Sequence, residues 1–168
     1  KALCRHRDDE TVQGWGLWAV QMLNGARALV TPLRAGAFQT PNAALAALTC
    51  LGGISFGQSD GASIHDMPDI IDAVVHTMRL FSQHQDVLYQ SCAVLGRATA
   101  FLVGEGLGNA ASCSECYQAA AQAAVSTLLQ LLSVRFADDW TVKVVCQALV
   151  DILESCEEAS PLRALICK

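Results

Sequence analysis

One short pattern recurs about four times in this chain of 168 residues and constrains its fold more than any other feature. In each copy, a polar break precedes an aliphatic residue, and a helical stretch follows with alanine and an aliphatic residue at fixed places. The copies run over residues 12–20, 41–48, 87–94 and 142–149. Repetition of a helical unit at intervals of a few tens of residues is typical of stacked arrays, because one unit alone cannot bury its apolar face.

The apolar residues between the polar breaks follow the period of an α-helix. Ile70, Val74 and Met78 form one stripe of such a helix, with charged residues on the opposite side. No stretch of useful length alternates as a β-strand does. Glycine-rich stretches at 52–61 and 104–108 mark the ends of helices and the boundaries of units. The sequence therefore predicts an all-α chain of helix pairs.

Helix starts are predicted by proline and by capping residues. All four prolines follow a Thr, Ser or Asp directly or within two residues, and proline is favoured in the first turn of a helix. We therefore expect each of them to begin a helix: Pro32, Pro41, Pro68 and Pro161. A capping box at 112–115 and the acidic pair Asp138 and Asp139 predict two further starts.

The residues also carry a family resemblance. Segments 9–23 and 84–95 resemble the passage from the second to the third helix of an armadillo repeat, and segments 41–54 and 138–153 are looser copies. The match covers most of the chain and overlaps with HEAT repeats. It implies a right-handed α-solenoid of about four degenerate armadillo/HEAT-like repeats, in one domain over residues 1–168. The expected units are 8–37, 38–60, 66–108 and 112–168.

Armadillo repeats imply a concave groove, lined by the third helix of each repeat, that holds a peptide or a partner protein. In the peptide-reading members that helix carries a Trp and, four residues later, an Asn that grips the peptide backbone. Trp18 matches the Trp position, but Met22 stands at the Asn position. The other copies pair Ala46 with Cys50, Ala93 with Arg97, and Gln147 with Asp151. Because no Asn occupies any of these four positions, we expect the groove to bind something other than an extended basic peptide, with these residues as candidates for partner binding: Trp18, Met22, Arg97 and Asp151.

Composition limits the class of protein. Apolar residues make up 52% of the chain and charged residues 16%, which argues against disorder and predicts a large buried or partner-covered surface. The net charge is −5 and the basic residues are mostly scattered, so we do not expect nucleic-acid binding. The longest nearly apolar stretch, 119–132, is too short to cross a bilayer, and residues 1–20 contain no signal peptide. Because the chain begins with Lys1 and ends in an apolar run, we expect a fragment of a larger protein, in contact with the rest of it.

Eight cysteines bear on location and chemistry. Four of them lie within apolar helical patterns, where a reduced thiol behaves as a small buried hydrophobe: Cys50, Cys92, Cys146 and Cys156. This pattern favours reduced thiols and an intracellular, cytoplasmic protein. Cys113 and Cys116 form a CxxC pair that is a weak metal or redox candidate, since a structural zinc site usually has four ligands and no second pair is present. We expect no cofactor and no metal.

The remaining motifs are weak signals of other functions, so the predicted function depends on the groove. The histidines form no metal-binding motif, and the glycines at 104–108 lack the Lys-Ser/Thr of a phosphate loop. Trp140 either anchors a partner or packs between adjacent helices, and we favour packing. The sequence thus predicts a non-enzymatic scaffold or adaptor that binds a partner protein. One alternative is a regulatory or structural segment within a larger assembly or multidomain enzyme, and a less favoured one is a thiol-redox or metal protein that uses Cys113 and Cys116.

Overall fold

Most of the part of the chain that the structure describes is helical. This computed structural model describes residues 9, 11, 12, 16, 19, 26–57, 62–106, 114–133, 139–156 and 161–167. Its helices are α3 (Arg27–Arg34), α4 (Pro41–Gly52), the 3-10 turn η1 (Ile64–Asp66), α5 (Met67–Leu80), α6 (Gln85–Phe101), the π-helical turn η2 (Leu102–Gly106), α8 (Ser114–Ser133), α9 (Asp139–Ser155) and α10 (Pro161–Ile166). The described residues contain no strand, only an isolated bridge between Phe56 and Ala62. The predicted all-α class is confirmed.

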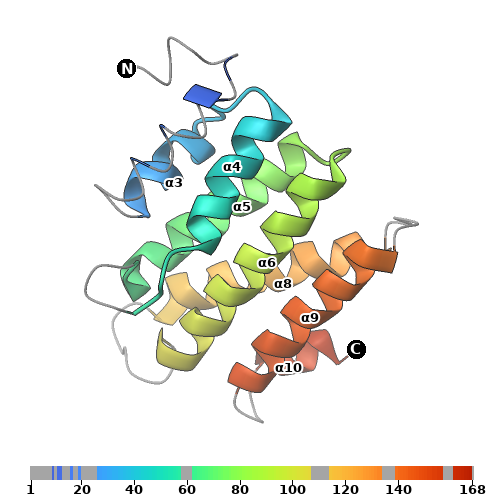
Figure 1. Ribbon diagram of the computed structural model, residues 1–168. Helices are drawn as coiled ribbons and strands as arrows, with labels where there is room; N and C mark the ends of the chain where they lie inside the picture. The colour runs from blue at the N-terminus through green and yellow to red at the C-terminus, as the bar shows by residue number, and fades with distance from the viewer. Residues whose placement is uncertain are drawn as a thin grey trace.

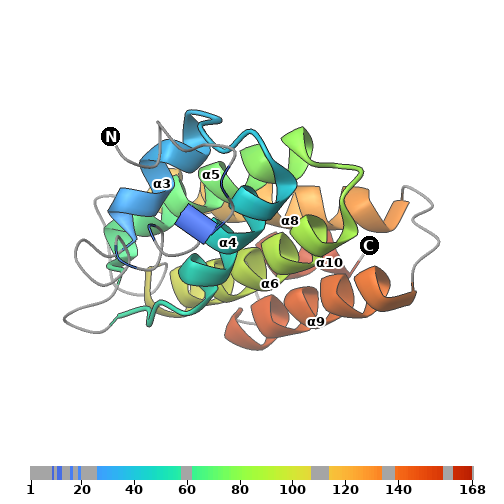
Figure 2. The same cartoon turned by 45° about the horizontal axis from the view of Figure 1, so that its top comes forward.

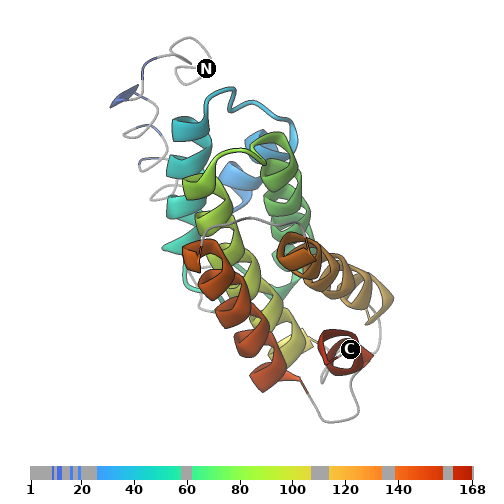
Figure 3. The same ribbon diagram turned by 90° about the vertical axis from the view of Figure 1, so that its right-hand side faces the viewer.

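The helices form two layers. Helices α4, α6 and α9 lie side by side in one layer, and α3, α5 and α8 lie side by side in the other (Figures 1 and 3). Each helix packs against the helix two places along the chain, and α10 packs on α8 and α9 (Figure 2). The repeated copies at 41–48, 87–94 and 142–149 all fall in the α4–α6–α9 layer. The first copy lies mostly outside the described residues, and the repeat family stays a prediction.

The apolar core lies between the two layers. The stripe predicted on α5 is buried, since Ile70, Val74 and Met78 are each at most 2% exposed. The largest fully buried side chains come from both layers and are Leu29, Leu33, Leu48, Leu51, Met67, Ile70, Ile71, Leu88, Leu95, Leu102 and Leu128. Burial of one such side chain stabilises a protein by about 1.5–3 kcal/mol, so the stacking of the layers supplies most of the driving force.

Helices α6 and α9 approach each other so closely that a glycine is needed between them. A Cβ atom built on Gly96 of α6 would lie 2.6 Å from the Cβ of Ala148 on α9 and 2.9 Å from its Cα. The two helices run in the same direction (Figure 1). This contact fixes the spacing and register of the α6–α9 pair.

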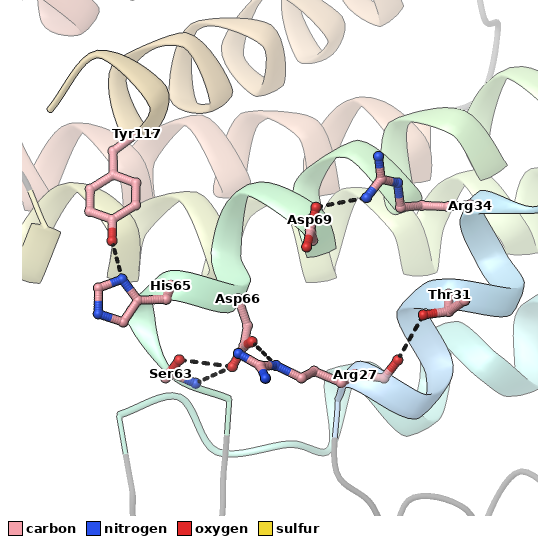
Figure 4. A network of polar contacts seen from close by, with 8 residues as sticks. All are labelled: Arg27, Thr31, Arg34, Ser63, His65, Asp66, Asp69 and Tyr117. Atoms are coloured by element: carbon pink, nitrogen blue, oxygen red, sulfur yellow. Dashed lines mark hydrogen bonds and ion pairs between the residues drawn. The ribbon is translucent and has the colours of Figure 1, made fainter. Parts of the chain in front are cut away.

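Polar contacts join α3 to the start of α5. Arg27 makes an ion pair with Asp66 at 2.5 Å, and Arg34 makes one with Asp69 at 2.7 Å (Figure 4). Arg34 also makes an ion pair with Asp72 at 3.0 Å. Asp66 also accepts hydrogen bonds from the backbone N–H and the hydroxyl of Ser63, at 2.9 and 2.8 Å. These contacts align α3 with α5, although exposed ion pairs contribute only about 0–1 kcal/mol each.

Proline marks three of the four helix starts that it predicts. Pro41 begins α4 after Thr40, whose hydroxyl accepts a hydrogen bond from the N–H of Ala43, and Pro68 and Pro161 lie in the first turns of α5 and α10. The prediction for Pro32 is wrong, because this residue lies inside α3. Helix α3 begins five residues earlier, at Arg27, so Pro32 cannot donate to the carbonyl of the preceding turn, and the helix ends two residues later. Of the remaining capping residues, Asp139 begins α9 as predicted, while 112, 113 and 138 lie outside the described residues.

One segment meets the length and hydropathy of a membrane span. It is Gln85–Glu105, which comprises α6 and most of η2, with a mean hydropathy of 1.3. In the fold, 61% of the apolar stretch of this segment is buried, because α6 packs against α4, α5, α8 and α9. Burial on several sides explains why α6 is apolar around most of its circumference. Within the described residues no other helix meets the same test.

Candidate partner-binding site

The layer α4–α6–α9 presents its three helix N-termini along one edge. All three helices run in the same direction, and their first residues lie toward the upper right of Figure 1. Two hollows occupy this edge. The first, of about 420 Å³, lies between α4 and α6, and the second, of about 430 Å³, lies between α6 and α9.

The two hollows adjoin, because Gln85 and Asp86 line both. We call them together the N-terminal trough. Its lining residues are Pro41, Asn42, Leu45, Gln83, His84, Gln85, Asp86, Val87, Leu88, Tyr89, Trp140 and Thr141. Each hollow falls within the size range of ligand-binding clefts, which is about 300–1,000 Å³.

An aromatic pair forms one wall of the trough. The rings of Tyr89 on α6 and Trp140 on α9 stack with their centroids 5.9 Å apart and their planes 15° from parallel. Trp140 is nevertheless 60% exposed, while Tyr89 is half-buried. The packing between adjacent helices that the sequence favours for Trp140 is present, and the side chain still leaves a large aromatic surface exposed to solvent.

The charged side chain that lines the trough is acidic. Asp86, in the first turn of α6, is the one Asp, Glu, Lys or Arg among the described residues that line it. Asp139 begins α9 beside Trp140. Lys143 follows Asp139 by four residues on α9 and is exposed, so Asp86 is the charge that distinguishes the hollows themselves.

The predicted groove residues lie elsewhere on the same layer. Trp18 and Met22 are outside the described residues. Arg97 on α6 is exposed and Asp151 on α9 is half-buried, and they come from the two helices that meet at Gly96. Arg97 is eight residues from Tyr89, which places it roughly 12 Å farther along the α6 axis. The structure thus brings these two predicted residues onto neighbouring helices but separates them from the trough.

Both of those side chains already have partners within the fold. The guanidinium of Arg97 donates a hydrogen bond to the carbonyl of Gly52, the last residue of α4, and lies over the ring of Phe56 at 5.4 Å from its centroid. A cation at a helix C-terminus complements the helix dipole, so Arg97 ties α6 to the end of α4. The carboxylate of Asp151 accepts a hydrogen bond from Gln147 at 2.8 Å, one helical turn away.

Burial of the cysteines differs in part from the prediction. Cys92 and Cys156 are buried and Cys50 is half-buried. Cys146 is exposed, which corrects the prediction of a buried thiol, because it lies on the side of α9 opposite Ala148 and therefore faces away from α6. Burial raises the pKa of the Cys92 thiol to about 12, so this thiol stays protonated at neutral pH.

Only one cysteine of the predicted CxxC pair lies among the described residues. Cys113 lies outside them, and Cys116 is an exposed free thiol in the first turn of α8. Among the residues searched, no group of three or more His, Cys, Asp or Glu is placed to hold a metal ion. His65 has a hydrogen bond of 2.7 Å to the hydroxyl of Tyr117, so it links η1 to α8 (Figure 4).

Sequence reasoning did not select Tyr89 and Asp86. Both lie in the first turns of a predicted helix, but nothing in the linear sequence pairs them with Trp140. No protein-family model, curated protein or solved structure matches the chain. The geometry of the α4–α6–α9 layer is therefore the observation that bears on function.

Proposed function

We propose that the chain is a non-enzymatic protein-interaction module, a short armadillo-like stack whose α4–α6–α9 layer binds a partner protein. The residues that resemble the groove-lining helix of armadillo repeats supply all three of these helices, and the helices lie side by side in one layer. That arrangement supports a shared binding face. The right-handed solenoid, the concavity of the face and an intracellular location are parts of the same proposal.

The exposed aromatic pair carries the proposal. Large aromatic side chains cost free energy when they face water, and Trp and Tyr are enriched among the residues that dominate binding energy at protein interfaces. Trp140 is 60% exposed although Tyr89 stacks on it, and it borders a hollow that is also lined by the polar residues Gln85, Asp86 and Thr141. This combination of an aromatic surface with a polar rim is typical of a binding site.

Comparative pull-downs from a native extract test the proposal. The baits are the wild-type chain, Trp140→Ala, and the matched control Leu80→Ala, which removes an exposed apolar side chain from α5 in the opposite layer. Circular dichroism confirms that each bait is folded. We expect at least one partner to bind the wild type and the control but to be lost with Trp140→Ala, because truncation of an interfacial hot spot costs about 2 kcal/mol or more.

The control decides between the layers. If Trp140→Ala retains every protein that the wild type captures, the aromatic pair does not bind a partner and the proposal is wrong. Loss of the same protein with Leu80→Ala alone would move the binding face to the α3–α5–α8 layer.

A second candidate function is a structural segment that packs against a larger assembly. Val142 and Val150 on α9 are 40% and 43% exposed, and the exposed Cys146 lies between them at helical spacing. By the helical period, all three face away from Ala148 and hence from α6. They form an apolar stripe at the open edge of the α4–α6–α9 layer, where a further helix would fit.

Solution behaviour distinguishes this second candidate. If the stripe packs permanently in an assembly, the isolated chain should self-associate in light scattering, and Val150→Asp should return it to a monomer. A wild-type chain that remains monomeric at high concentration would exclude a permanent interface on this edge.

A further inference from the structure

We infer that the N-terminal trough binds an arginine side chain that the partner presents, with Asp86 as the counter-charge and the Tyr89–Trp140 pair as the stacking surface. The inference rests on the proposed function, and it specifies the chemistry of the partner. It concerns a single side chain at the helix N-termini, not a peptide backbone held along the positions of Arg97 and Asp151.

Electrostatics favour a cation over an anion at this edge. Helix N-termini alone attract anions, but Asp86 and Asp139 each bring a full negative charge against about half a positive charge from each terminus. No Lys or Arg is among the described residues that line the trough. A positively charged side chain from a partner would therefore face the carboxylate of Asp86 within the hollow, without a competing Lys or Arg among those lining residues.

The aromatic wall favours arginine over lysine. A guanidinium is planar and stacks on an indole face, and it forms two parallel hydrogen bonds to one carboxylate, whereas an ammonium is a compact and strongly hydrated charge. Trp is the strongest aromatic partner for a cation. Asp86 and Trp140 line the same hollow of about 430 Å³, so one guanidinium has access to both groups.

The chain already contains one example of this chemistry. The guanidinium of Arg97 lies over the ring of Phe56 while it donates a hydrogen bond to the carbonyl of Gly52. An aromatic face and an oxygen acceptor together hold that arginine at an exposed position. The trough offers a larger aromatic surface and a charged acceptor in place of a neutral carbonyl.

Peptide titrations monitored by NMR test the inference. The probes are a pentapeptide of alternating glycine and arginine and the same peptide with citrulline, the uncharged isostere of arginine, in each arginine position. We expect the arginine peptide to shift the indole N–H signal of Trp140, assigned with Trp140→Phe, and the amide signals of Asp86 and Tyr89. Citrulline should bind at least tenfold more weakly, and added salt should weaken the arginine peptide only.

Two matched variants show where the charge acts. Asp86→Asn should reduce affinity for the arginine peptide at least tenfold, whereas Glu154→Gln, which removes an exposed carboxylate of α9 outside the trough, should leave it unchanged. Equal binding of the citrulline peptide, an equal loss with Glu154→Gln, or no shift of Trp140 at millimolar peptide would overturn the inference. If the peptides fail while Trp140→Ala still loses a partner in the pull-down, the arginine inference is wrong and the proposed function stands. If Trp140→Ala loses no partner, the proposed function itself is wrong.

Discussion

The close contact between α6 and α9 makes Gly96→Ala a sharp test of the fold. The new Cβ would lie 2.6 Å from the Cβ of Ala148, while carbon atoms in favourable contact are about 3.5–4.0 Å apart. The two helices must therefore separate by roughly 1 Å, or their backbones must bend. Flexible side-chain ends cannot absorb this shift, because the opposing atoms are a Cβ and the Cα at 2.9 Å.

Two opposing effects determine how much Gly96→Ala changes the free energy of unfolding. Alanine in place of glycine inside a helix stabilises by about 1 kcal/mol, and overpacking of a well-packed interface costs about 1–3 kcal/mol or more. Since the overlap here involves backbone atoms, we expect the upper part of that range and a net loss of ~1–2 kcal/mol in the free energy of unfolding. The assay is urea denaturation followed by circular dichroism at 222 nm.

Two further variants isolate the cause. Gly104→Ala is the control, because nothing lies within 4 Å of a Cβ at that position, and it should not lower the free energy of unfolding by overpacking. In the Ala148→Gly background, Gly96→Ala should cost less free energy of unfolding than it does in the wild type, although the Cα of residue 148 still crowds the new methyl group. If Gly96→Ala stabilises the protein by the full helix-propensity gain, the close approach of α6 and α9 is refuted.

Two other predictions concern titrating groups. Burial alone would raise the pKa of Asp66, but hydrogen bonds from Arg27 and Ser63 outweigh it and lower the pKa. Ionised Asp66 therefore stabilises the fold above its unfolded pKa near 4, and this contribution is lost as the pH falls through the lower folded pKa. Asp66→Asn should cost at most about 1 kcal/mol at pH 7 and almost nothing near pH 2 in urea denaturation, and a pH-independent difference would refute the ion pair. In the native protein, iodoacetamide should label exposed Cys146 and spare Cys92, which should react only on unfolding; equal rates would contradict the burial of Cys92.

Local features of the structure follow from the sequence to different degrees. Thr40 and Pro41 specify the start of α4 within three residues of chain, so the prediction needed no tertiary information. Pro32 failed because proline is compatible with a first turn but does not require one, and the apolar residues Leu29, Val30 and Leu33 bury α3 against its neighbours despite the proline. Packing outweighed a local signal there.

The candidate site, like the helix starts, could be predicted from the sequence only in part. Sequence reasoning identified Trp140 as a residue with two possible roles and selected Arg97 for the groove. In the structure, Arg97 contacts the carbonyl of Gly52 and the ring of Phe56 within the same chain. These two residues are near each other in the sequence but far from Arg97. A linear pattern assigns a residue to a face of a helix, but it does not say which neighbouring helix end lies within reach of a long side chain.

By itself, the sequence determined the all-α class, the positions of most helices and the apolar faces that they bury, because helical period, caps and breaks act within a few residues. Only the tertiary structure decided that α4, α6 and α9 run in the same direction side by side, with Gly96 against Ala148 and Tyr89 stacked on Trp140. These contacts join residues that are distant in the chain, and they depend on how close two helices come and in what register. The aromatic pair and the trough beside it exist only because that packing brings three helix N-termini together.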